Sequence, residues 1–544
     1  MTNKLRIRLF LLFFGFSCIY LIILFNLFLI QVWNRQFFIN LAEQQYHVST
    51  TQLPERGTIL DRTGTSYLAR NRECFSAFII PQKLKDYNAL HTFLVKHFPH
   101  AAQQLTHKKN NAFMYIKRRL TDDEKDLITT SNLPDIHLLQ ESSRFYPLLS
   151  ACPLIGFTDI DNRGAAGIEL QCNEILTGKP NTYHLEKDAR SGYFYFKKEL
   201  QEVGYESTSI QLTIDSNLQF LIDEELAACI DKWHAQDGAI IVMDPQTGDI
   251  LAMSSYPYVN PTTTHSFNIA DTKHKVIADA HELGSVIKVF AALAALEENV
   301  VTADELIDCK NSKTCIINGR TINTWKPHGV IPFSDVIAYS NNIGIAQVAK
   351  RVGEKIYDHY TTLGFGTKTG IAMPGEHSGF VNHPKNWSKQ SIISLSYGYE
   401  ISATLLQLAC AFCTIANNGH RIKPRILMHE PIVMDNKALY KPEHIETIKN
   451  ILRKVTEYGT GHRAHIKGYT IMTKTGTANK LVNGVYDNKK NIFTCAAIIE
   501  KNNYQRVIVT FINESNAANA YASTIATPLL EQVTEKMLIH ERMV

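Results

Sequence analysis

One stretch near the start of the chain limits the possible folds more than any other feature. Residues 9–30 read LFLLFFGFSCIYLIILFNLFLI, and Asn26 is their one clearly polar side chain. At about 1.5 Å per helical residue, a helix of this length crosses the roughly 30 Å hydrocarbon core of a bilayer. A cleaved signal peptide is the alternative, but its apolar segment would be shorter, and no small-x-small cleavage site follows Ile30. The stretch therefore predicts one membrane-spanning helix.

The residues on either side of this stretch predict its orientation. Three basic residues precede it: Lys4, Arg6 and Arg8. Positive residues beside a span stay on the cytoplasmic side, and Trp33 stands where an interfacial aromatic residue is expected. We expect residues 1–8 to form a cytoplasmic tail and residues 9–30 to anchor the chain in the inner (cytoplasmic) membrane. The remaining chain then lies outside the cytoplasm.

Net charge and cysteine spacing argue against a nucleic-acid partner and a cysteine metal site. The formal net charge of the 544 residues is +4, and no basic cluster lies beyond the first residues, which argues against a nucleic-acid partner. Cys410 and Cys413 share a metal-type spacing but lie in an apolar, helix-like run without a matching pair. Cys309 and Cys315 bracket the polar segment CKNSKTC, which reads as a turn. An oxidising compartment would permit a bridge between them, and two unbridged thiols are the alternative.

Beyond the anchor the chain divides into two parts. Residues 31–208 mix β-like runs (75–80 and 184–195) with helical stretches, and no residue cluster in them suggests chemistry. Residues 209–544 have a denser pattern of strands and helices. We predict strands at 238–244, 249–255, 469–474, 493–499 and 506–513, and helices at 218–233 and 524–538. Strands at both ends of a helical middle predict an α+β domain, with one antiparallel sheet and helices packed on it.

The first chemical motif lies in HELGSVIKVFAALAALEEN (281–299). Ser285 is the one serine in the chain that is followed three residues later by a lysine. Residues i and i+3 share a helix face, so Lys288 would lie beside the Ser285 hydroxyl and could serve as its base. The run 289–296 is apolar nearly all round, which predicts a buried helix, and burial favours a neutral amine. Alone, this spacing also fits an ordinary helix with a surface lysine.

A second motif opens the segment AYSNNIGIAQVAK (338–350). Ser340 could relay a proton between base and leaving group, and the Asn342 amide could hold a substrate backbone. The pair also fits a simple Ser/Asn helix cap.

The third motif, Lys474-Thr475-Gly476-Thr477, lies on the predicted strand in GYTIMTKTGTANK (468–480). The lysine and the threonine hydroxyls would bind a substrate carboxylate, and Gly476 would let a ligand approach the strand backbone. Lys368-Thr369-Gly370 repeats the triplet, but it lies between Gly366 and a Pro-Gly turn without a flanking strand. We interpret that copy as a structural loop.

Ser-x-x-Lys, Ser-x-Asn and Lys-Thr-Gly in this order form the motif set of penicillin-binding proteins and serine β-lactamases. Over nearly its whole length the chain resembles a class B penicillin-binding protein, most closely the division-specific transpeptidase of the septum. Further segments carry the resemblance: RGTILDRTG (56–64), RFYP (144–147), Gly156, GAAGIE (164–169), PGE (374–376) and the run 397–419. Two residues depart from the family pattern, Leu283 for proline and Thr473 for glycine, and we expect both at the rim of the active site.

The resemblance implies a fold and a reaction. Residues 31–208 would form an elongated, dimerisation-like mixed α/β pedestal, and residues 209–544 a transpeptidase domain. Ser285 would attack a peptidoglycan stem peptide and release D-alanine, with Lys288 as base and Ser340 as proton shuttle. The backbone N–H groups of Ser285 and Thr477 would form the oxyanion hole. The resemblance implies no metal or cofactor, sensitivity to β-lactams, and work beside a multi-span glycosyltransferase and other divisome proteins.

Three alternatives stay open at this point. A β-lactamase shares the motifs but needs a group that activates water. Glu282, three residues before Ser285, either braces the loop or serves that purpose. A D,D-carboxypeptidase would pass the acyl group to water, and a silent divisome scaffold would bind without reacting.

Overall fold

The structure is a computed structural model that describes residues 3–52, 54–187, 194–258, 260, 272–482, 484–515, 517 and 520–543. The chain divides into two compact units. One comprises Met1–Glu55 with Thr177–Thr208, and the other Arg56–Leu176 with Ser209–Val544. Residues 56–176 therefore belong to the same unit as the predicted catalytic region.

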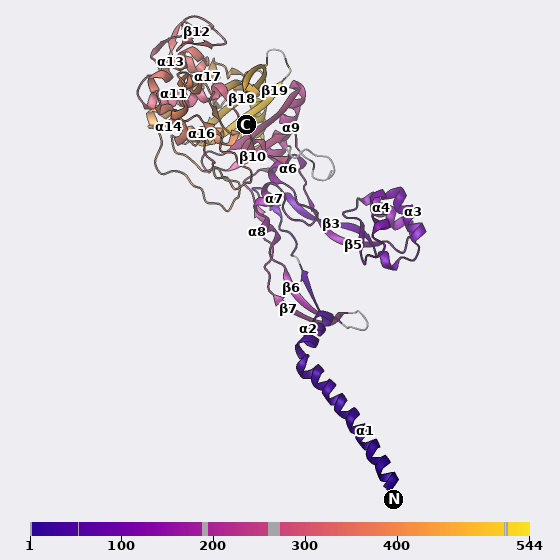
Figure 1. The fold of residues 1–544 in the computed structure, drawn as a ribbon. Coiled ribbons are helices and arrows are strands. Elements are labelled where there is room, and N and C mark those ends of the chain that lie inside the picture. Colours follow the sequence, from indigo (N-terminus) through magenta and orange to yellow (C-terminus); the bar gives the residue numbers. More distant parts are fainter. Residues whose placement is uncertain are drawn as a thin grey trace. The chain divides into compact units, whose positions relative to one another are not determined.

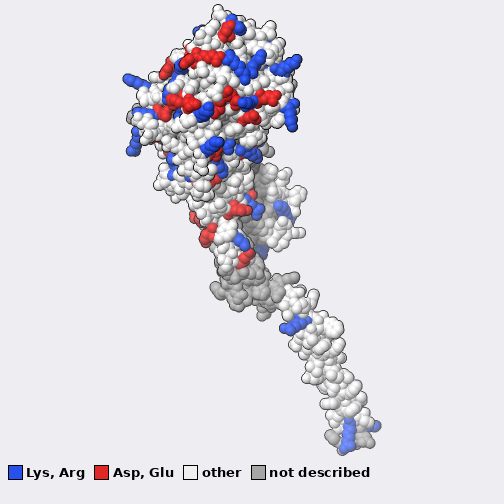
Figure 2. Space-filling view, turned by 90° about the vertical axis from the view of Figure 1, so that its left-hand side faces the viewer, with Lys and Arg blue, Asp and Glu red and all other residues white. Residues whose placement is uncertain are grey.

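The first unit begins with the predicted apolar helix. Helix α1 (Asn3–Phe28) continues through a π-helical turn (Leu29–Trp33), and Lys4–Trp33 is long and apolar enough to cross a membrane. Its side chains are exposed rather than packed against protein. Figure 1 shows the helix in indigo, and Figure 2 shows basic residues toward its start. The helix is longer at both ends than the predicted 9–30.

After helix α2 (Arg35–Tyr46), the same unit contains a three-stranded antiparallel sheet. Its strands are β1 (His47–Gln52), β6 (Asn181–Lys187) and β7 (Phe194–Glu202). The predicted run 184–195 thus falls on two strands, and its part 188–193 lies outside the described residues.

Within the second unit, residues 56–176 build a long strand with a small core of its own. Strand β3 (Tyr67–Ile79), which includes most of the predicted run 75–80, pairs with β4 (Met114–Lys117) and β5 (His137–Phe145). Leu90 and Leu94 of helix α3 and Leu105 of helix α4 pack into the core beside this sheet. The helices of this region are α3 (Tyr87–His97), α4 (Pro99–His107), α5 (Asp122–Ser131), α6 (Cys152–Ile155), α7 (Gly167–Gln171) and α8 (Asn173–Thr177).

The motif segments of this region meet in a buried ion cluster. Arg56 Nε lies 2.7 Å from Glu169 Oε2, and Arg144 Nε lies 2.6 Å from Glu169 Oε1. All three side chains are buried, and a buried carboxylate needs such charged partners. Nearby, β2 (Ile59–Leu60) runs parallel to β8 (Ile210–Gln211) and joins this region to the second half of the unit. The cluster is a structural brace.

The catalytic region is built on a five-stranded antiparallel sheet in the order β10-β9-β19-β18-β17. The strands are β9 (Ala235–Met243), β10 (Ile250–Tyr256), β17 (Thr470–Val482), β18 (Val485–Lys501) and β19 (Tyr504–Ser515). Alternate residues enter opposite cores: Ile240 and Val242 face one cluster, and Ala239 and Ile241 face the other. The predicted α+β arrangement is confirmed, and β17 is an edge strand.

Helices cover both faces of this sheet (Figure 1). Helices α9 (Ser216–Trp233) and α18 (Ala526–His540) supply one core, close to their predicted ranges, whereas α11 (Lys288–Glu297) and α16 (Leu405–Ala416) supply the other. The remaining helices are α10 (Lys275–Ala278), α12 (Phe333–Ala338), α13 (Asn342–Val352), α14 (Lys355–Thr362), α15 (Ser391–Ser396) and α17 (Pro442–Glu457). Short strand pairs join them: β11 (Leu306–Asp308) with β14 (Val330–Pro332), β12 (Thr314–Ile317) with β13 (Arg320–Asn323), and β15 (Phe380–Val381) with β16 (Ile401–Ser402).

All ten cysteines are free thiols. Cys309 is buried and Cys315 lies on β12, so the alternative of unbridged thiols holds for this pair. Cys410 and Cys413 are buried in α16, as the apolar pattern around them predicts.

Candidate active site

Ser285 lies on a tight turn that leads into a buried helix. Residues Gly284–Ile287 form one 3-10 turn, and α11 follows at once. Gly284 has φ +60°, and a Cβ there would lie 2.8 Å from the carbonyl oxygen of Thr477. Only glycine fits this position without a shift, because it tolerates the left-handed region and needs no side-chain space. The turn therefore holds Ser285 close against β17.

Lys288 points from α11 into the centre of the motif cluster. Its side chain is fully buried, and Nζ lies 3.1 Å from Ser285 Oγ and 2.5 Å from Asn342 Oδ1. Burial, with a smaller contribution from the positive charge of Lys474, holds the pKa of Lys288 well below its ordinary value. Residues 289–296 are all buried too, as the sequence predicts. A neutral amine so close to a hydroxyl can accept its proton.

The second motif folds as a strained turn before α13. Ser340 has φ +57°, which is uncommon for a residue with a side chain and is found at functional sites. Its carbonyl oxygen accepts a 2.7 Å hydrogen bond from Lys288, and its hydroxyl lies 3.1 Å from the same amine. Asn341, rather than Ser340 or Asn342, caps α13 by accepting from the N–H of Gly344. Asn342 Nδ2 donates to the carbonyl of Asn323 at 2.6 Å.

The third motif completes a chain of polar atoms. Lys474 on β17 is fully buried, and its Nζ donates to Ser340 Oγ at 3.1 Å and to the carbonyl of Thr475 at 2.9 Å. Burial lowers the pKa of Lys474 to about 7. The Ser340 hydroxyl thus lies between the two lysines and connects Lys288 with β17. The structure brings all three predicted motifs together.

Gly476 packs closely against the turn that carries Ser285. A Cβ at this position would lie 2.4 Å from the carbonyl oxygen of Leu283 and 3.0 Å from the backbone nitrogen of Val286. Close approach is indeed required here, but by the turn that carries Ser285. This contact is one that the sequence pattern did not indicate, and the approach of a ligand to Gly476 stays a prediction.

Two threonines flank Gly476. The Thr475 hydroxyl pairs with Thr460 Oγ1 at 2.7 Å, a contact that no motif spacing indicated. The Thr477 hydroxyl accepts from the N–H of Ala522 at 3.1 Å, which leaves its own proton free to donate. Strand β17 therefore offers hydroxyl groups at Thr475 and Thr477 and an amine at Lys474. These groups suit a carboxylate ligand.

Glu282 acts as a brace in this structure. Its Oε1 accepts from the N–H of Glu400 at 2.9 Å and from the Tyr486 hydroxyl at 3.1 Å. These contacts join the loop before Ser285 to residue 400 and to the β17–β18 hairpin. Desolvation raises the pKa of this carboxyl. The bracing interpretation is the one that these contacts favour.

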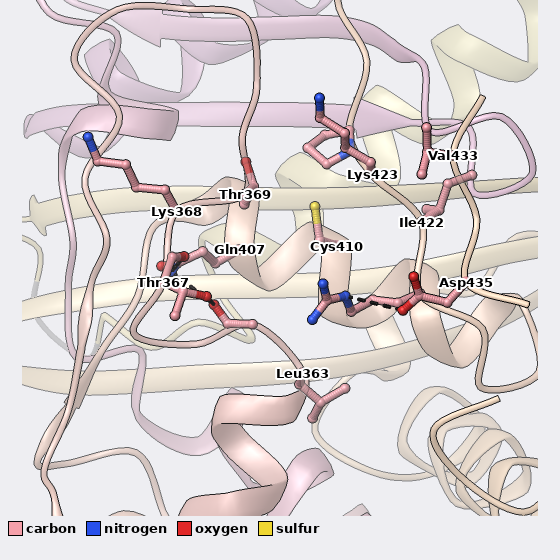
Figure 3. Close-up of a pocket in the computed structure, with 13 residues that line it drawn as sticks. Leu363, Thr367, Lys368, Thr369, Gln407, Cys410, Ile422, Lys423, Val433 and Asp435 are labelled. Carbon is pink, nitrogen blue, oxygen red and sulfur yellow. Dashed lines mark hydrogen bonds and ion pairs between the residues drawn. The ribbon is translucent and has the colours of Figure 1, made fainter. Parts of the chain in front are cut away.

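The second Lys-Thr-Gly copy lies on a loop, as predicted. The carboxylate of Glu376 accepts from the N–H of Thr369 at 2.6 Å, from its hydroxyl at 2.5 Å and from the N–H of Gly370 at 3.2 Å. Figure 3 shows Lys368 and Thr369 on the wall of a separate cavity, with Cys410 and Lys423. The donors of this triplet are therefore occupied by an internal carboxylate.

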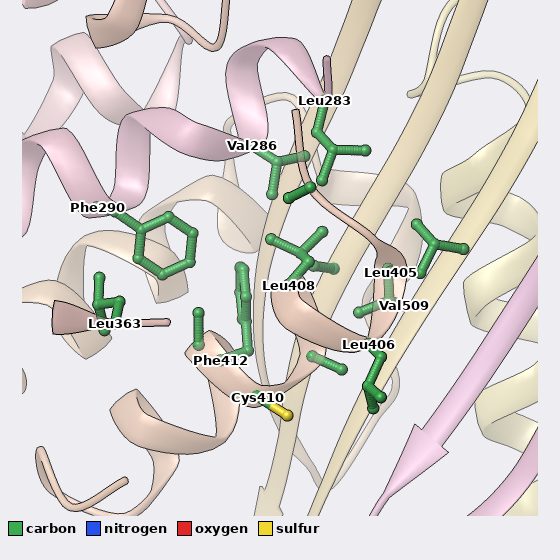
Figure 4. Close-up of a cluster of buried hydrophobic side chains, with 14 of the residues drawn as sticks. Leu283, Val286, Phe290, Leu363, Leu405, Leu406, Leu408, Cys410, Phe412 and Val509 are labelled. Carbon is green, nitrogen blue, oxygen red and sulfur yellow. The ribbon is translucent and has the colours of Figure 1, made fainter. Parts of the chain in front are cut away.

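The two departures from the family pattern do not lie at the rim. Leu283 is 1% exposed and belongs to the core cluster with Val286, Phe290 and Phe412 (Figure 4). Thr473 is fully buried, and its hydroxyl lies 2.9 Å from Thr456 Oγ1. Both side chains point into packed protein, so the expected placement at the rim is wrong. The rings of Phe290 and Phe412 pack edge to face with their centroids 5.7 Å apart, and this core packs against helix α11.

Residues from distant segments complete the site, and sequence reasoning missed them: Asn323, Thr460, Tyr486 and Ala522. None lies at a fixed spacing from a motif, so no local signal identifies them. Among the described residues, no group of three or more His, Cys, Asp or Glu side chains is placed to hold a metal ion.

Comparisons with known proteins agree with this geometry. Residues 238–535 match the penicillin-binding protein transpeptidase domain, and residues 51–206 match the penicillin-binding protein dimerisation domain. The chain is 30% identical to "Peptidoglycan D,D-transpeptidase FtsI" of Buchnera aphidicola over 89% of its own length and 86% of the relative's. It is 29% identical to the protein of the same name in Escherichia coli K12, covering 87% and 82% of the two chains.

Solved structures share the fold. Penicillin binding protein 3 of Mycobacterium tuberculosis, in a complex with aztreonam, superposes with a TM-score of 0.68 at 22% identity, covering 91% of this chain and 97% of that one. The transpeptidase domain of Burkholderia pseudomallei penicillin-binding protein 3 gives a TM-score of 0.54 at 27% identity, covering 60% and 96%. The motif geometry, the two matched domains and these relatives agree, and the chain belongs to the class B penicillin-binding proteins.

Proposed function

We propose that this protein is a serine-type peptidoglycan D,D-transpeptidase that cross-links stem peptides in the septal wall, through an acyl-enzyme at Ser285. One observation carries the proposal: the buried Lys288 amine lies 3.1 Å from Ser285 Oγ. Burial lowers the pKa of this amine well below its ordinary value and so favours the neutral form, which can activate a hydroxyl that is otherwise a weak nucleophile.

The first step forms an ester and releases D-alanine. Ser285 Oγ attacks the carbonyl carbon of the penultimate D-alanine while Lys288 takes the hydroxyl proton. The bond from that carbon to the nitrogen of the terminal D-alanine then breaks. Ser340, whose hydroxyl lies 3.1 Å from both lysine amines, passes a proton to the departing nitrogen. D-alanine leaves as a neutral amine.

Substrate orientation follows from β17. Lys474, Thr475 and Thr477 bind the terminal carboxylate, and the Asn342 amide holds the peptide backbone. The N–H groups of Ser285 and Thr477 stabilise the oxyanion, an arrangement that typically contributes a few kcal/mol per donor. The proximity of Gly284 and Gly476 to the opposite backbone supports this, because it holds the turn and the strand close together.

The second step regenerates the free enzyme by aminolysis of the ester. The amine of a neighbouring stem peptide attacks the ester carbon, its proton passes to the Ser285 oxygen through Lys288, and the new amide is the cross-link. A β-lactam follows the first step only. Ser285 attacks the carbonyl carbon of the lactam ring, and the bond from that carbon to the ring nitrogen breaks. The nitrogen remains part of the bound acyl group and obstructs the attack of a second amine.

We also propose the roles of the other regions. Residues 1–8 form the cytoplasmic tail, 9–30 the inner-membrane anchor, 31–208 a non-catalytic pedestal and 209–544 the extracytoplasmic transpeptidase domain. The basic residues before α1 support this orientation. Polymerisation of glycan then depends on a separate multi-span glycosyltransferase, with other divisome proteins as partners.

The test is a coupled assay with the full-length protein in detergent or vesicles. Glycan strands with pentapeptide stems are supplied, and released D-alanine and cross-linked dimers are both measured. Transpeptidation predicts one D-alanine for each cross-link, and the Ser285→Ala variant abolishes both. D-alanine without cross-links would indicate a carboxypeptidase, and neither product would indicate a scaffold.

A further inference from the structure

Trp325 is an exposed aromatic residue beside the second motif. It follows strand β13 (Arg320–Asn323), and 59% of its surface is exposed. Its indole N–H donates to the carbonyl oxygen of Tyr339 at 2.9 Å, so the ring orientation is fixed while much of the ring remains in solvent. A large aromatic surface held in this way is prepared for contact with a ligand, because little side-chain entropy remains to be lost.

Two hydrogen bonds tie this segment to the catalytic groups. Tyr339, the acceptor of the indole N–H, directly precedes Ser340. Asn323, two residues before the tryptophan, accepts from Asn342 Nδ2 at 2.6 Å, and Asn342 Oδ1 in turn accepts from Lys288. Segment 323–325 therefore contacts both ends of the turn 339–342, through Trp325 at Tyr339 and through Asn323 at Asn342.

The residue between them has an unsatisfied polar group. Thr324 is 7% exposed, and its buried hydroxyl has no hydrogen-bond partner within the described part of the chain. An unpaired buried hydroxyl is unfavourable, but this one is enclosed by protein and lies out of a ligand's reach. The carbonyl of Asn323 already accepts from Asn342, so the exposed indole of Trp325 is the group that this segment offers to a ligand.

We propose that Trp325 determines specificity by packing against the side chain of the stem-peptide residue that precedes D-alanyl-D-alanine. This inference rests on the proposed function. The leaving D-alanine is directed to Lys474 and Thr477, so the acyl half of the substrate extends the other way from Ser285. Asn342, whose amide is proposed to hold the backbone of that half, has its Oδ1 2.5 Å from the Lys288 amine.

The chemical class of the contacted group follows from the surface. The flat indole face suits a long aliphatic side chain, and it also attracts a terminal ammonium group by a cation–π interaction. Trp325 is then a contact residue for the acyl donor. A merely structural role is the alternative: its N–H bond could simply hold Tyr339 and so Ser340.

Two acyl donors separate these roles. Both are D-alanyl thioesters with a carboxylate on the leaving group, and they differ in the preceding residue, which is glycine in one and lysine in the other. The readout is the ratio of kcat/KM for the lysine donor to that for the glycine donor. We expect Trp325→Ala to lower this ratio about tenfold, the size expected for loss of a few apolar contacts.

Matched variants complete the design. Trp325→Phe removes the N–H bond to Tyr339 but retains an aromatic face, so the ratio of the two kcat/KM values should stay close to that of the wild-type protein. Phe220→Ala removes an aromatic residue that is 49% exposed on α9, on the other face of the sheet, and should leave the ratio unchanged. Each preparation is normalised by active-site titration with a labelled penicillin.

The outcomes are distinct. If Trp325→Ala slows both donors equally, or if Trp325→Phe loses as much of the ratio as Trp325→Ala, the tryptophan acts through Tyr339 and the inference is overturned. If the wild-type protein is acylated by neither donor, the proposed function itself fails. A wild-type protein that reacts with both donors, with an unchanged ratio in every variant, contradicts the specificity role alone.

Discussion

The two Lys-Thr-Gly triplets in this chain have the same sequence and opposite surroundings. Lys474-Thr475-Gly476 lies on a strand, with its lysine buried against Ser340 and its glycine against the turn that carries Ser285. Lys368-Thr369-Gly370 lies on a loop, where the carboxylate of Glu376 already occupies its amides and its threonine hydroxyl.

The difference teaches that a three-residue motif acquires its chemistry from its neighbours. Burial lowers the pKa of Lys474 to about 7, whereas a glutamate within the chain satisfies the second triplet as a ligand would. An open carboxylate site needs donors that the protein itself leaves unused. Each of the following experiments contrasts the two copies or the residues beside them.

The largest effect should come from the nucleophile beside the first copy. Ser285→Ala removes the oxygen that forms the ester, so covalent penicillin labelling should fall by roughly 10⁴-fold or more. Lys288→Arg should also be inactive, because a guanidinium remains charged and cannot accept the proton. Labelling is followed by gel fluorescence, with circular dichroism as the control for folding. Labelling of Ser285→Ala at the wild-type rate would place the chemistry elsewhere.

The next effect contrasts the triplets directly. Lys474→Ala should slow acylation by orders of magnitude, because it removes the charge that binds the carboxylate and the contact to Ser340. Lys368→Ala should change the rate by less than about tenfold, equivalent to roughly 1.4 kcal/mol. Stopped-flow acylation of both variants gives the comparison. A reversed order would mean that the substrate carboxylate binds at the loop.

A several-fold effect is expected from pH. Binding of a carboxylate requires a charged Lys474, and the pKa of that amine is lowered to about 7 by burial. As pH rises through this value the free enzyme loses the charge, so kcat/KM for a carboxylate-bearing donor should fall. Burial also lowers the pKa of Lys288 well below its ordinary value, which favours its neutral form.

The corresponding fall in kcat should occur at a higher pH than the fall in kcat/KM, since a bound carboxylate stabilises the ammonium form of Lys474. In the Lys368→Ala variant, kcat/KM should fall over the same pH range as in the wild-type protein. A kcat/KM that rises steadily from pH 7 to about 9 would contradict the role of Lys474.

The smallest change in rate should come from the carboxylate of the loop. Glu376→Ala removes the charged acceptor of two partly buried N–H groups and a hydroxyl, at a cost of about 1–3 kcal/mol in the free energy of unfolding. Denaturant titration measures this loss, and Glu376→Gln, which keeps an acceptor oxygen, should recover part of it. Acylation per folded molecule should stay at the wild-type level in both. A slower acylation with unchanged stability would give the loop a chemical role.

The sequence predicted the parts of the fold that follow a regular apolar pattern. The cores of all five central strands and the buried helix after Lys288 lie where alternation or all-round apolarity indicates. Strand β17, however, extends to Val482 rather than ending at 474, because its second half is polar and pairs with β18 through backbone hydrogen bonds. Backbone pairing leaves no trace in side-chain periodicity.

The site shows the same limit. Ser285, Lys288, Ser340 and Lys474 were identified by spacing, and their contacts agree with it. The partners of Gly476 and Glu282 were not identifiable, since they lie on segments 100 or more residues away and meet only in the folded chain. The two partners of such a contact share no sequence pattern that would connect them.

The most direct test of the account is the position and lifetime of a penicillin adduct. The purified protein is labelled, digested and analysed by mass spectrometry at intervals, while hydrolysed drug is measured in solution. We predict one adduct, on the peptide that contains Ser285, that persists for many minutes, far longer than the sub-second turnover typical of enzymes. An adduct on another serine would contradict the assignment of the nucleophile. Rapid loss of the adduct with an excess of hydrolysed drug would instead show a β-lactamase, in which a group such as Glu282 activates water.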